Sequence, residues 1–190
     1  MFKNNCIVID DELELKAPQL QDAAALNALI IKNQLRLAEY MPWANGQPTE
    51  ADAREYIALH KDDLSANRPP ALLLWARGKL GGAVGFHDHN TANNKVALGY
   101  WIDDDLEGKG LVTRSCIVMN DYAFYVLGLN RITILCAEQN ARSRAIPEKL
   151  GFTNEGIEKD GQWVYDRYLD MVHYRMLERE WRALETRRKK

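Results

Sequence analysis

The spacing of apolar and polar residues predicts strands and helices along the first third of the chain. Residues 12–16 alternate charged and apolar side chains, which is typical of a strand with one buried face. A helix should follow over residues 20–30, where apolar side chains recur about every 3.6 positions, and residues 33–40 extend it or form a second helix. Thr49 is a suitable N-cap for a further helix, which we expect to run to about residue 67.

The middle of the chain predicts an antiparallel meander, because three short apolar runs at residues 71–76, 80–87 and 95–102 are separated by turn-rich segments. We then expect a glycine-containing loop at residues 108–112 and an amphipathic helix at 113–127. A β-branched strand at 131–137 and a short helix at 140–150 should follow. Residues 163–181 should add one or two strands and a terminal turn of helix. This order predicts an α+β fold in which helices flank a mixed, mostly antiparallel sheet.

The composition is that of a globular protein. With 190 residues, 46% of them hydrophobic and 27% charged, the chain can bury a sizeable core, and we expect residues 1–190 to form one domain. A net charge of -2 provides no global attraction to nucleic acid, so we expect no direct nucleic-acid partner. No apolar run approaches the roughly 20 residues of a membrane span, and the N-terminus lacks an export-signal pattern. We therefore expect no membrane partner and a cytoplasmic location.

The cysteines and histidines give no metal signature. Cys6, Cys116 and Cys136 are an odd number at wide spacing, which excludes a disulfide framework and a zinc-type pair. Cys116 and Cys136 lie among apolar neighbours and should be core residues. His87 and His89 share one face of a predicted strand, but without a third ligand nearby they favour strand-end or substrate-contact roles. We expect no metal.

The segment at residues 106–113 carries the strongest chemical signal. Gly108 and Gly110 let the backbone turn sharply between a strand and a helix. The backbone N–H groups of the loop and of the first helical turn, together with the helix dipole, would form an anion site suited to pyrophosphate. Lys109 and Arg114 are near enough in sequence to add positive charge. The alternative is a tight strand-to-helix turn that binds nothing.

Two further motifs occur in order around this loop. Residues 99–102 (Gly-Tyr-Trp-Ile) lead into it, and residues 140–152 follow the pattern Asn-x-x-Ser-x-x-Ile-x-x-Lys-x-Gly-Phe. With the loop, these motifs resemble the GNAT superfamily of acetyltransferases, in particular its RimJ/RimL branch of ribosomal-protein N-terminal acetyltransferases. The likeness covers roughly residues 11–182. It implies the GNAT fold and an acetyl-CoA-dependent N-acetyltransferase.

The loop departs from the superfamily pattern at two positions. That pattern reads Gln/Arg-x-x-Gly-x-Gly/Ala, and Gly110 occupies its central glycine. Glu107 stands in place of Gln or Arg, and Val112 in place of Gly or Ala. These departures keep open a non-catalytic acyl-CoA-binding module as an alternative to an enzyme.

The resemblance also implies roles for individual residues. The pantetheine arm of acetyl-CoA would lie between the strands at 95–102 and 131–137 and pair with the backbone near Trp101 and Ile102. Ser143 would protonate the leaving thiolate. The other implied cofactor contacts are Gly108, Lys109, Gly110, Leu111, Val112 and Thr113 for the pyrophosphate, Asn140 for the pantetheine, and Arg142, Arg144 and Lys149 for the 3′-phosphate. Helix capping by Asn140 and Ser143, and ordinary surface charge for the cations, are the alternatives.

The general base and the acceptor are not assigned by the resemblance. The branch has a glutamate base at the position that is Gln162 here, and an amide cannot take a proton; Asp160, Glu138 and Asp103 remain candidates. The acceptor is a primary amine, which we expect to be a protein N-terminal α-amine such as that of a ribosomal protein. A polyamine or aminoglycoside is the alternative acceptor. Dimers are common in this superfamily, so a homodimer is a further expectation.

Overall fold

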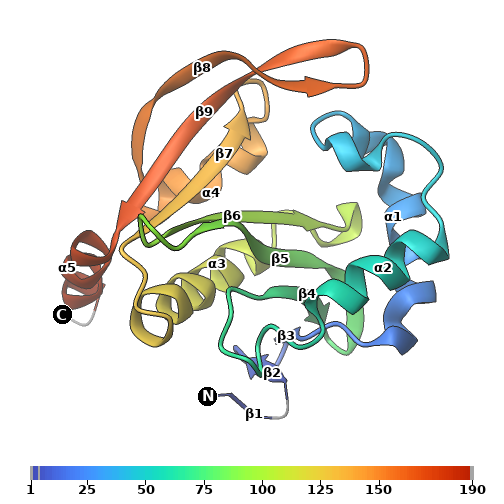
Figure 1. Ribbon diagram of the computed structural model, residues 1–190, viewed down its shortest axis with the longest axis horizontal. Helices are drawn as coiled ribbons and strands as arrows, with labels where there is room; N and C mark the ends of the chain where they lie inside the picture. Colours follow the sequence, from blue (N-terminus) through green and yellow to red (C-terminus); the bar gives the residue numbers. More distant parts are fainter. Residues whose placement is uncertain (1, 4, 189–190) are drawn as a thin grey trace.

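A computed structural model describes residues 2–3 and 5–188 and shows a mixed sheet flanked by helices (Figure 1). Within this described part the sheet has nine strands in the order β1-β2-β3-β4-β5-β6-β7-β9-β8. Neighbouring strands are antiparallel except β6 and β7, which are parallel. The strands are β1 (Phe2–Lys3), β2 (Cys6–Val8), β3 (Leu13–Lys16), β4 (Ala71–Ala76), β5 (Lys79–Asn90), β6 (Lys95–Ile102), β7 (Arg131–Ala137), β8 (Thr153–Val164) and β9 (Arg167–Leu177).

Helices cover both faces of this sheet. The residues of β4 show the division, because successive side chains of a strand point to opposite faces. Leu72 and Leu74 belong to the core cluster that includes Cys116 and Cys136, whereas Leu73 packs in a second cluster with α1 and α2. The predicted α+β class, with a mixed, mostly antiparallel sheet, is confirmed. The α-helices are α1 (Ala23–Ala38), α2 (Glu50–His60), α3 (Leu111–Asp121), α4 (Ala141–Leu150) and α5 (Glu178–Arg188).

Two predicted helices have wrong boundaries. The helix expected to reach residue 67 is α2, which ends at His60. Beyond it Asp63, which is buried, contacts His60 Nδ1 at 2.8 Å and accepts a hydrogen bond of 2.8 Å from Arg68 Nε, and these bonds hold the chain in turns. The helix predicted from residue 113 begins two residues earlier as α3, and its last turn, Tyr122–Val126, is π-helical.

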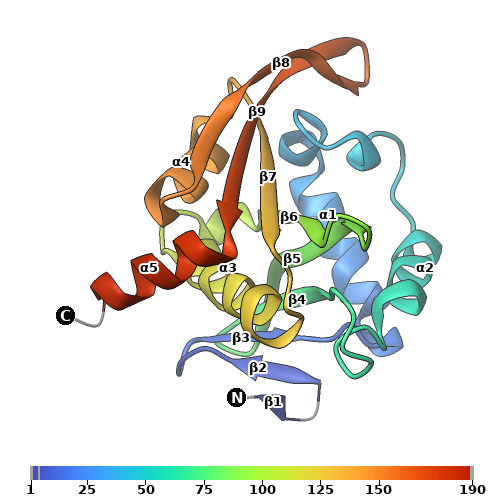
Figure 2. The same ribbon diagram turned by 60° about the vertical axis from the view of Figure 1, so that its left-hand side comes forward.

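The C-terminal region holds more structure than predicted. β8 begins at Thr153 rather than within residues 163–181, and with β9 it forms a long hairpin at one edge of the sheet (Figure 2). Nearly every residue of β8 is exposed, so its sequence has no alternation of apolar side chains, and backbone pairing with β9 holds it. The predicted terminal turn is the longer helix α5. The strands β1 and β2 were not predicted. No helix in the described ranges is long and apolar enough to span a membrane.

Candidate active site

A cleft of about 1040 Å³ opens beside the end of β6, where β6 and β7 separate. These two strands pair only through residues 95–97 and 131–133, so they diverge beyond that point. The end of α1, the loop before α3 and the start of α4 form the other walls. Of the residues predicted for the cofactor and for proton transfer, Lys109 and Arg144 lie outside the cleft. The cleft brings together the others, namely Trp101, Ile102, Gly108, Gly110, Leu111, Val112, Thr113, Asn140, Arg142, Ser143 and Lys149.

The glycine loop forms the N-terminal end of α3. Gly108 and Gly110 have φ angles of 72° and 71°, in the left-handed region, and Gly110 is the N-cap of α3. A Cβ at either position would meet no atom within 4 Å, so the backbone conformation rather than lack of space favours glycine there. Because the first residues of α3 line the cleft, their helical N–H groups lie where an anion would bind.

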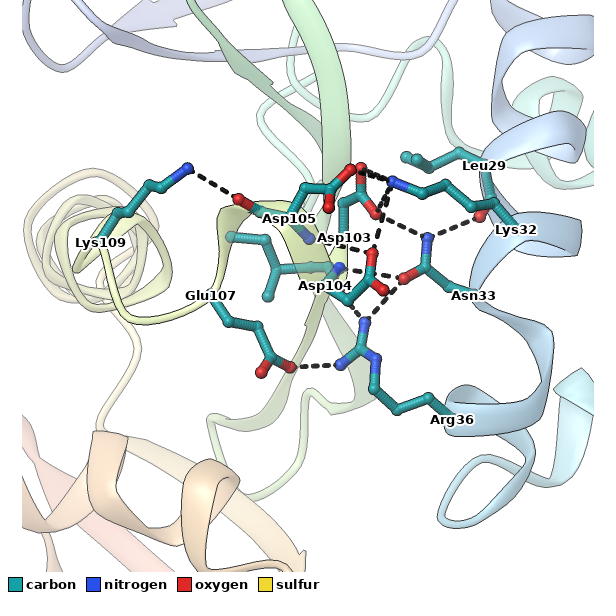
Figure 3. Close-up of polar contacts among 10 residues, drawn as sticks. Leu29, Lys32, Asn33, Arg36, Asp103, Asp104, Asp105, Glu107 and Lys109 are labelled. Atoms are coloured by element: carbon teal, nitrogen blue, oxygen red, sulfur yellow. Dashed lines mark hydrogen bonds and ion pairs between the residues drawn. The ribbon is translucent and has the colours of Figure 1, made fainter.

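Three of the cations considered as phosphate ligands are bound elsewhere. Lys109 Nζ donates to the carbonyl oxygen of Asp105 at 2.7 Å (Figure 3). Arg114 pairs with Asp10 at 3.2 Å on another side of α3. Arg144 donates to the Tyr174 hydroxyl at 3.0 Å and to the Glu138 carbonyl at 3.1 Å. Of the predicted cationic ligands, Arg142 and Lys149 line the cleft.

The Ser143 hydroxyl lies between a phenol and a thiol. Its Oγ is 3.4 Å from the Tyr100 hydroxyl oxygen and 3.2 Å from Cys136 Sγ. Asn140 caps α4 by accepting a hydrogen bond of 3.1 Å from the Ser143 backbone N–H, so the capping role considered for Asn140 is present in the structure. The Tyr100 hydroxyl donates to the Ser143 carbonyl oxygen at 2.9 Å.

Both neighbours of Ser143 keep their protons at neutral pH. Removal from water raises the pKa of Tyr100 well above its ordinary value, and proximity to Cys136 adds to this shift. Burial likewise raises the pKa of the Cys136 thiol. Ser143 is therefore held between two neutral groups that can donate and accept hydrogen bonds, an arrangement that suits proton transfer at its Oγ.

Glu107 lies between two arginines at the mouth of the loop. Arg36 Nη1, from α1, donates to Oε1 of Glu107 at 2.6 Å (Figure 3), and Arg142 Nη1, from α4, donates to Oε2 at 2.6 Å. Arg36 also donates to Asn33 Oδ1 at 3.0 Å and to the Ile102 carbonyl oxygen. Glu107 thus connects the loop to α1 and α4.

The acidic run at residues 103–105 faces α1 rather than the cleft. Lys32 Nζ lies 2.8, 3.4 and 2.5 Å from carboxylate oxygens of Asp103, Asp104 and Asp105 (Figure 3). Burial favours the protonated form of Asp103, but hydrogen bonds from Lys32 and Asn33 outweigh this and lower its pKa. The three carboxylates are close enough together to bind a cation, and the lysine ammonium fills that role. The run therefore joins α1 to the end of β6.

The three carboxylates considered as bases lie outside the cleft. Asp103 is bound as described, and Glu138 and Asp160 are absent from the lining. The Gln162 side chain donates to the Tyr40 carbonyl oxygen at 2.8 Å and so ties β8 to the end of α1. In the described part of the chain, the carboxylates that line the cleft are Glu39 and Glu107.

The contribution of α1 to the cleft was not predicted from the sequence. Arg36, Tyr40 and Met41 line the wall opposite α4, more than 60 residues away in sequence from the loop. One signal was available. Asn33 lies on the apolar stripe of α1 and is buried, and a buried polar side chain needs a partner from another element.

Comparison with known proteins identifies the family of the chain. The family model described as "Acetyltransferase (GNAT) domain" matches residues 12–153. The "Putative ribosomal N-acetyltransferase YdaF" of Bacillus subtilis (strain 168) is 38% identical over 91% of this chain and 95% of its own length. The "Ribosomal-protein-serine acetyltransferase" of Escherichia coli (strain K12) is 24% identical over 88% of this chain and 94% of its own length.

A solved structure shows the same architecture with ligands bound. The microcin C7 self-immunity acetyltransferase MccE, in complex with acetyl-CoA and AMP, superposes with a TM-score of 0.84. It is 26% identical, and the match covers 92% of this chain and 97% of that one. Family model, relatives and fold agree, and the chain belongs to the GNAT family and is an N-acetyltransferase.

Proposed function

We propose that this enzyme transfers the acetyl group of acetyl-CoA to the α-amine at a protein N-terminus, with a ribosomal protein as the target. One observation carries the transfer reaction: Ser143 and the N-terminal end of α3 line the same cleft beside the separating strands. The names of the relatives from Bacillus subtilis and Escherichia coli support the acceptor class.

The residues of the cleft fit acetyl-CoA. The left-handed Gly108 and Gly110 and the first turn of α3 offer backbone N–H donors to a pyrophosphate, and Arg142 and Lys149 offer positive charge. The end of β6 no longer pairs with β7, so its backbone is available to an amide-bearing arm. Bound there, acetyl-CoA would supply the activated acetyl thioester.

As the amine nitrogen forms its bond to the acetyl carbon and the C–S bond breaks, Ser143 would pass a proton to the departing sulfur through its Oγ. The proton that the attacking amine loses replaces the one that Ser143 gives up, so the products are the amide and free CoA thiol. A thiol has a pKa of about 8.5, so the sulfur needs little assistance and a serine hydroxyl suffices. Tyr100 and Cys136 hold Ser143 Oγ and keep their own protons, because burial raises the pKa of each. Backbone N–H groups at the end of β6 would stabilise the negative charge that develops on the acetyl oxygen.

The acceptor needs only modest deprotonation. A free α-amine has a pKa of about 8, so roughly a tenth is neutral at pH 7, whereas a lysine side chain, with a pKa of about 10.4, is almost wholly protonated. The candidate carboxylate bases Asp103, Glu138 and Asp160 do not line the cleft, and Gln162 cannot act as a base. Of the described carboxylates that do line it, Glu107 is bound to two arginines and Glu39 is the other. An α-amine, which needs the least help from a base, is therefore the acceptor class we propose.

An acceptor panel tests the proposal. The enzyme is incubated with acetyl-CoA and each of four kinds of acceptor: peptides with free or blocked α-amines, lysine peptides, polyamines and aminoglycosides. Mass spectrometry then identifies the acetylated products. Acetylation confined to free peptide α-amines is expected. Acetylation of the small amines alone would replace the proposed acceptor class. Acetyl-CoA binding without any transfer would contradict catalysis and favour an acyl-CoA-binding module.

A further inference from the structure

The two arginines bound to Glu107 differ in their exposure and in the number of protein groups that they bind. The Arg36 side chain is 31% exposed, and besides Glu107 its guanidinium donates to Asn33 and to the Ile102 carbonyl oxygen. Arg36 is thus fixed between α1 and β6. The Arg142 side chain is 80% exposed, and within residues 5–188 Glu107 is the one protein partner that the structure gives it. Arg142 therefore has guanidinium N–H donors left for a ligand.

Glu107 and Arg142 both lie next to residues of the proposed cofactor site. Glu107 immediately precedes Gly108 of the glycine loop, and Arg142 lies in the first turn of α4, one residue before Ser143. All four residues line the same cleft. A guanidinium held at this point by one of its nitrogens can still present others to a phosphate, whose geometry matches the planar fork.

We propose that Glu107 is a positioning residue that holds Arg142 against a phosphate of acetyl-CoA. This inference rests on the proposed use of acetyl-CoA. A long, exposed arginine loses side-chain entropy when it binds a ligand, and a preformed ion pair removes part of that cost. Arg36 provides a second positive charge, so the trio of side chains carries a net charge of +1 and does not repel the phosphate. In this way Glu107 contributes to binding indirectly, at a position where the superfamily has a residue that can itself donate a hydrogen bond.

Removal of the Glu107 carboxylate should change the affinity for acetyl-CoA in opposite directions, depending on whether Glu107 positions Arg142 or only repels the phosphate. A carboxylate that merely stands near a phosphate repels it, so its removal should tighten binding. If the carboxylate instead holds Arg142 in place, its removal should weaken binding. Glu107→Ala is therefore expected to raise the Kd for acetyl-CoA by about 3- to 10-fold, within the range of a typical net hydrogen-bonding contact.

A double-mutant cycle shows whether the effect passes through Arg142. In an Arg142→Ala background, Glu107→Ala should leave the Kd unchanged or lower it, because only the repulsion remains. Lys149→Ala is the matched control: Lys149 lines the cleft without contacting Glu107, so the effects of Glu107→Ala and Lys149→Ala should add. Steady-state kinetics should give a raised KM for acetyl-CoA at unchanged kcat, which a general loss of structure would not produce.

Titration calorimetry with acetyl-CoA and with its 3′-dephospho form is the deciding experiment, with thermal unfolding to confirm that each variant is folded. Loss of affinity for both ligands supports the proposal and assigns Arg142 to the pyrophosphate; loss for acetyl-CoA alone supports it and assigns the 3′-phosphate. Equal or tighter binding by Glu107→Ala, or an equal loss with and without Arg142, overturns it. A wild-type protein that binds no acetyl-CoA would instead contradict the proposed function.

Discussion

The hydroxyl of Tyr100 makes the hydrogen bond that Pro147 cannot make. Pro147 lies inside α4 and has no N–H, so the carbonyl oxygen four residues earlier, that of Ser143, lacks its helical donor. Tyr100, from β6, donates to this oxygen at 2.9 Å. A proline that would weaken the helix thereby creates an acceptor beside the catalytic candidate, and the tyrosine fixes α4 against the end of β6.

This relationship predicts that Tyr100 and Pro147 are coupled in stability. Tyr100→Phe should lower the free energy of unfolding by about 1–3 kcal/mol, because a part-buried carbonyl loses its donor. With Pro147→Ala, the new N–H can satisfy the same oxygen, and Tyr100→Phe should then cost less. Urea unfolding of the two single variants and the double variant measures the coupling. Equal costs of Tyr100→Phe in the two backgrounds would show that the tyrosine does not replace the missing donor.

Ser143→Ala should reduce turnover without reducing cofactor binding. The alanine removes the proton donor but keeps the backbone N–H that Asn140 caps, so α4 should stay folded. Because the leaving thiolate is only weakly basic, we expect kcat to fall about 10- to 100-fold, at or below the lower limit that is typical of general acid catalysis. Calorimetry should find the Kd for acetyl-CoA within about twofold of wild type. An unchanged kcat would remove Ser143 from the mechanism.

Gly110→Val should weaken acetyl-CoA binding because of backbone geometry. A β-branched residue disfavours the left-handed conformation at φ 71°, with a cost of about 1–2 kcal/mol. Gly128, at φ 65°, is the matched control, since it also has open space for a Cβ but lies outside the cleft. Both substitutions should lower the melting temperature by similar amounts, while only Gly110→Val should raise the Kd. A Kd for acetyl-CoA that is the same in Gly110→Val as in wild type would contradict the assignment of this loop to the cofactor.

Asp103 should contribute pH-dependent stability. Its pKa in the folded protein is lowered, so its contribution is fully present above the ordinary carboxyl pKa of about 3.9 and is lost as the pH falls through the lower folded value. The difference in unfolding free energy between wild type and Asp103→Asn should therefore be largest at pH 5 and above and should shrink below about pH 4. Denaturant titrations at several pH values measure it, with the exposed Asp104→Asn as control. A difference independent of pH would contradict the assignment.

The order of elements was predictable where the sequence has local signals. Alternation identified β3, short apolar runs identified β4 to β6, and β-branched residues identified β7. The glycine loop placed the start of α3 to within two residues, and the Asn140 motif located the start of α4. The start of β8 was not predicted, because nearly all of its side chains are exposed and its sequence shows no alternation of apolar and polar residues. The end of α2 depends on hydrogen bonds of Asp63 that no local pattern shows.

The site was predictable through its motifs but not through its long-range contacts. Arg36 meets Glu107 across 71 positions of sequence, and Tyr100 meets Ser143 across 43. Such pairs depend on how α1 and α4 pack on the sheet. Lys109, expected at the phosphates from its place in the loop, instead binds the Asp105 carbonyl because its side chain leaves the loop on the other side.

The proposed function depends above all on acetylation of an α-amine. The most direct test uses a single peptide that carries a free N-terminus and an internal lysine, incubated with acetyl-CoA and either wild-type enzyme or the Ser143→Ala variant. Fragmentation mass spectrometry then locates the added acetyl group. We expect acetylation at the N-terminal nitrogen with wild type and far less with the variant. Acetylation at the lysine, or equal N-terminal acetylation with both proteins, would contradict it.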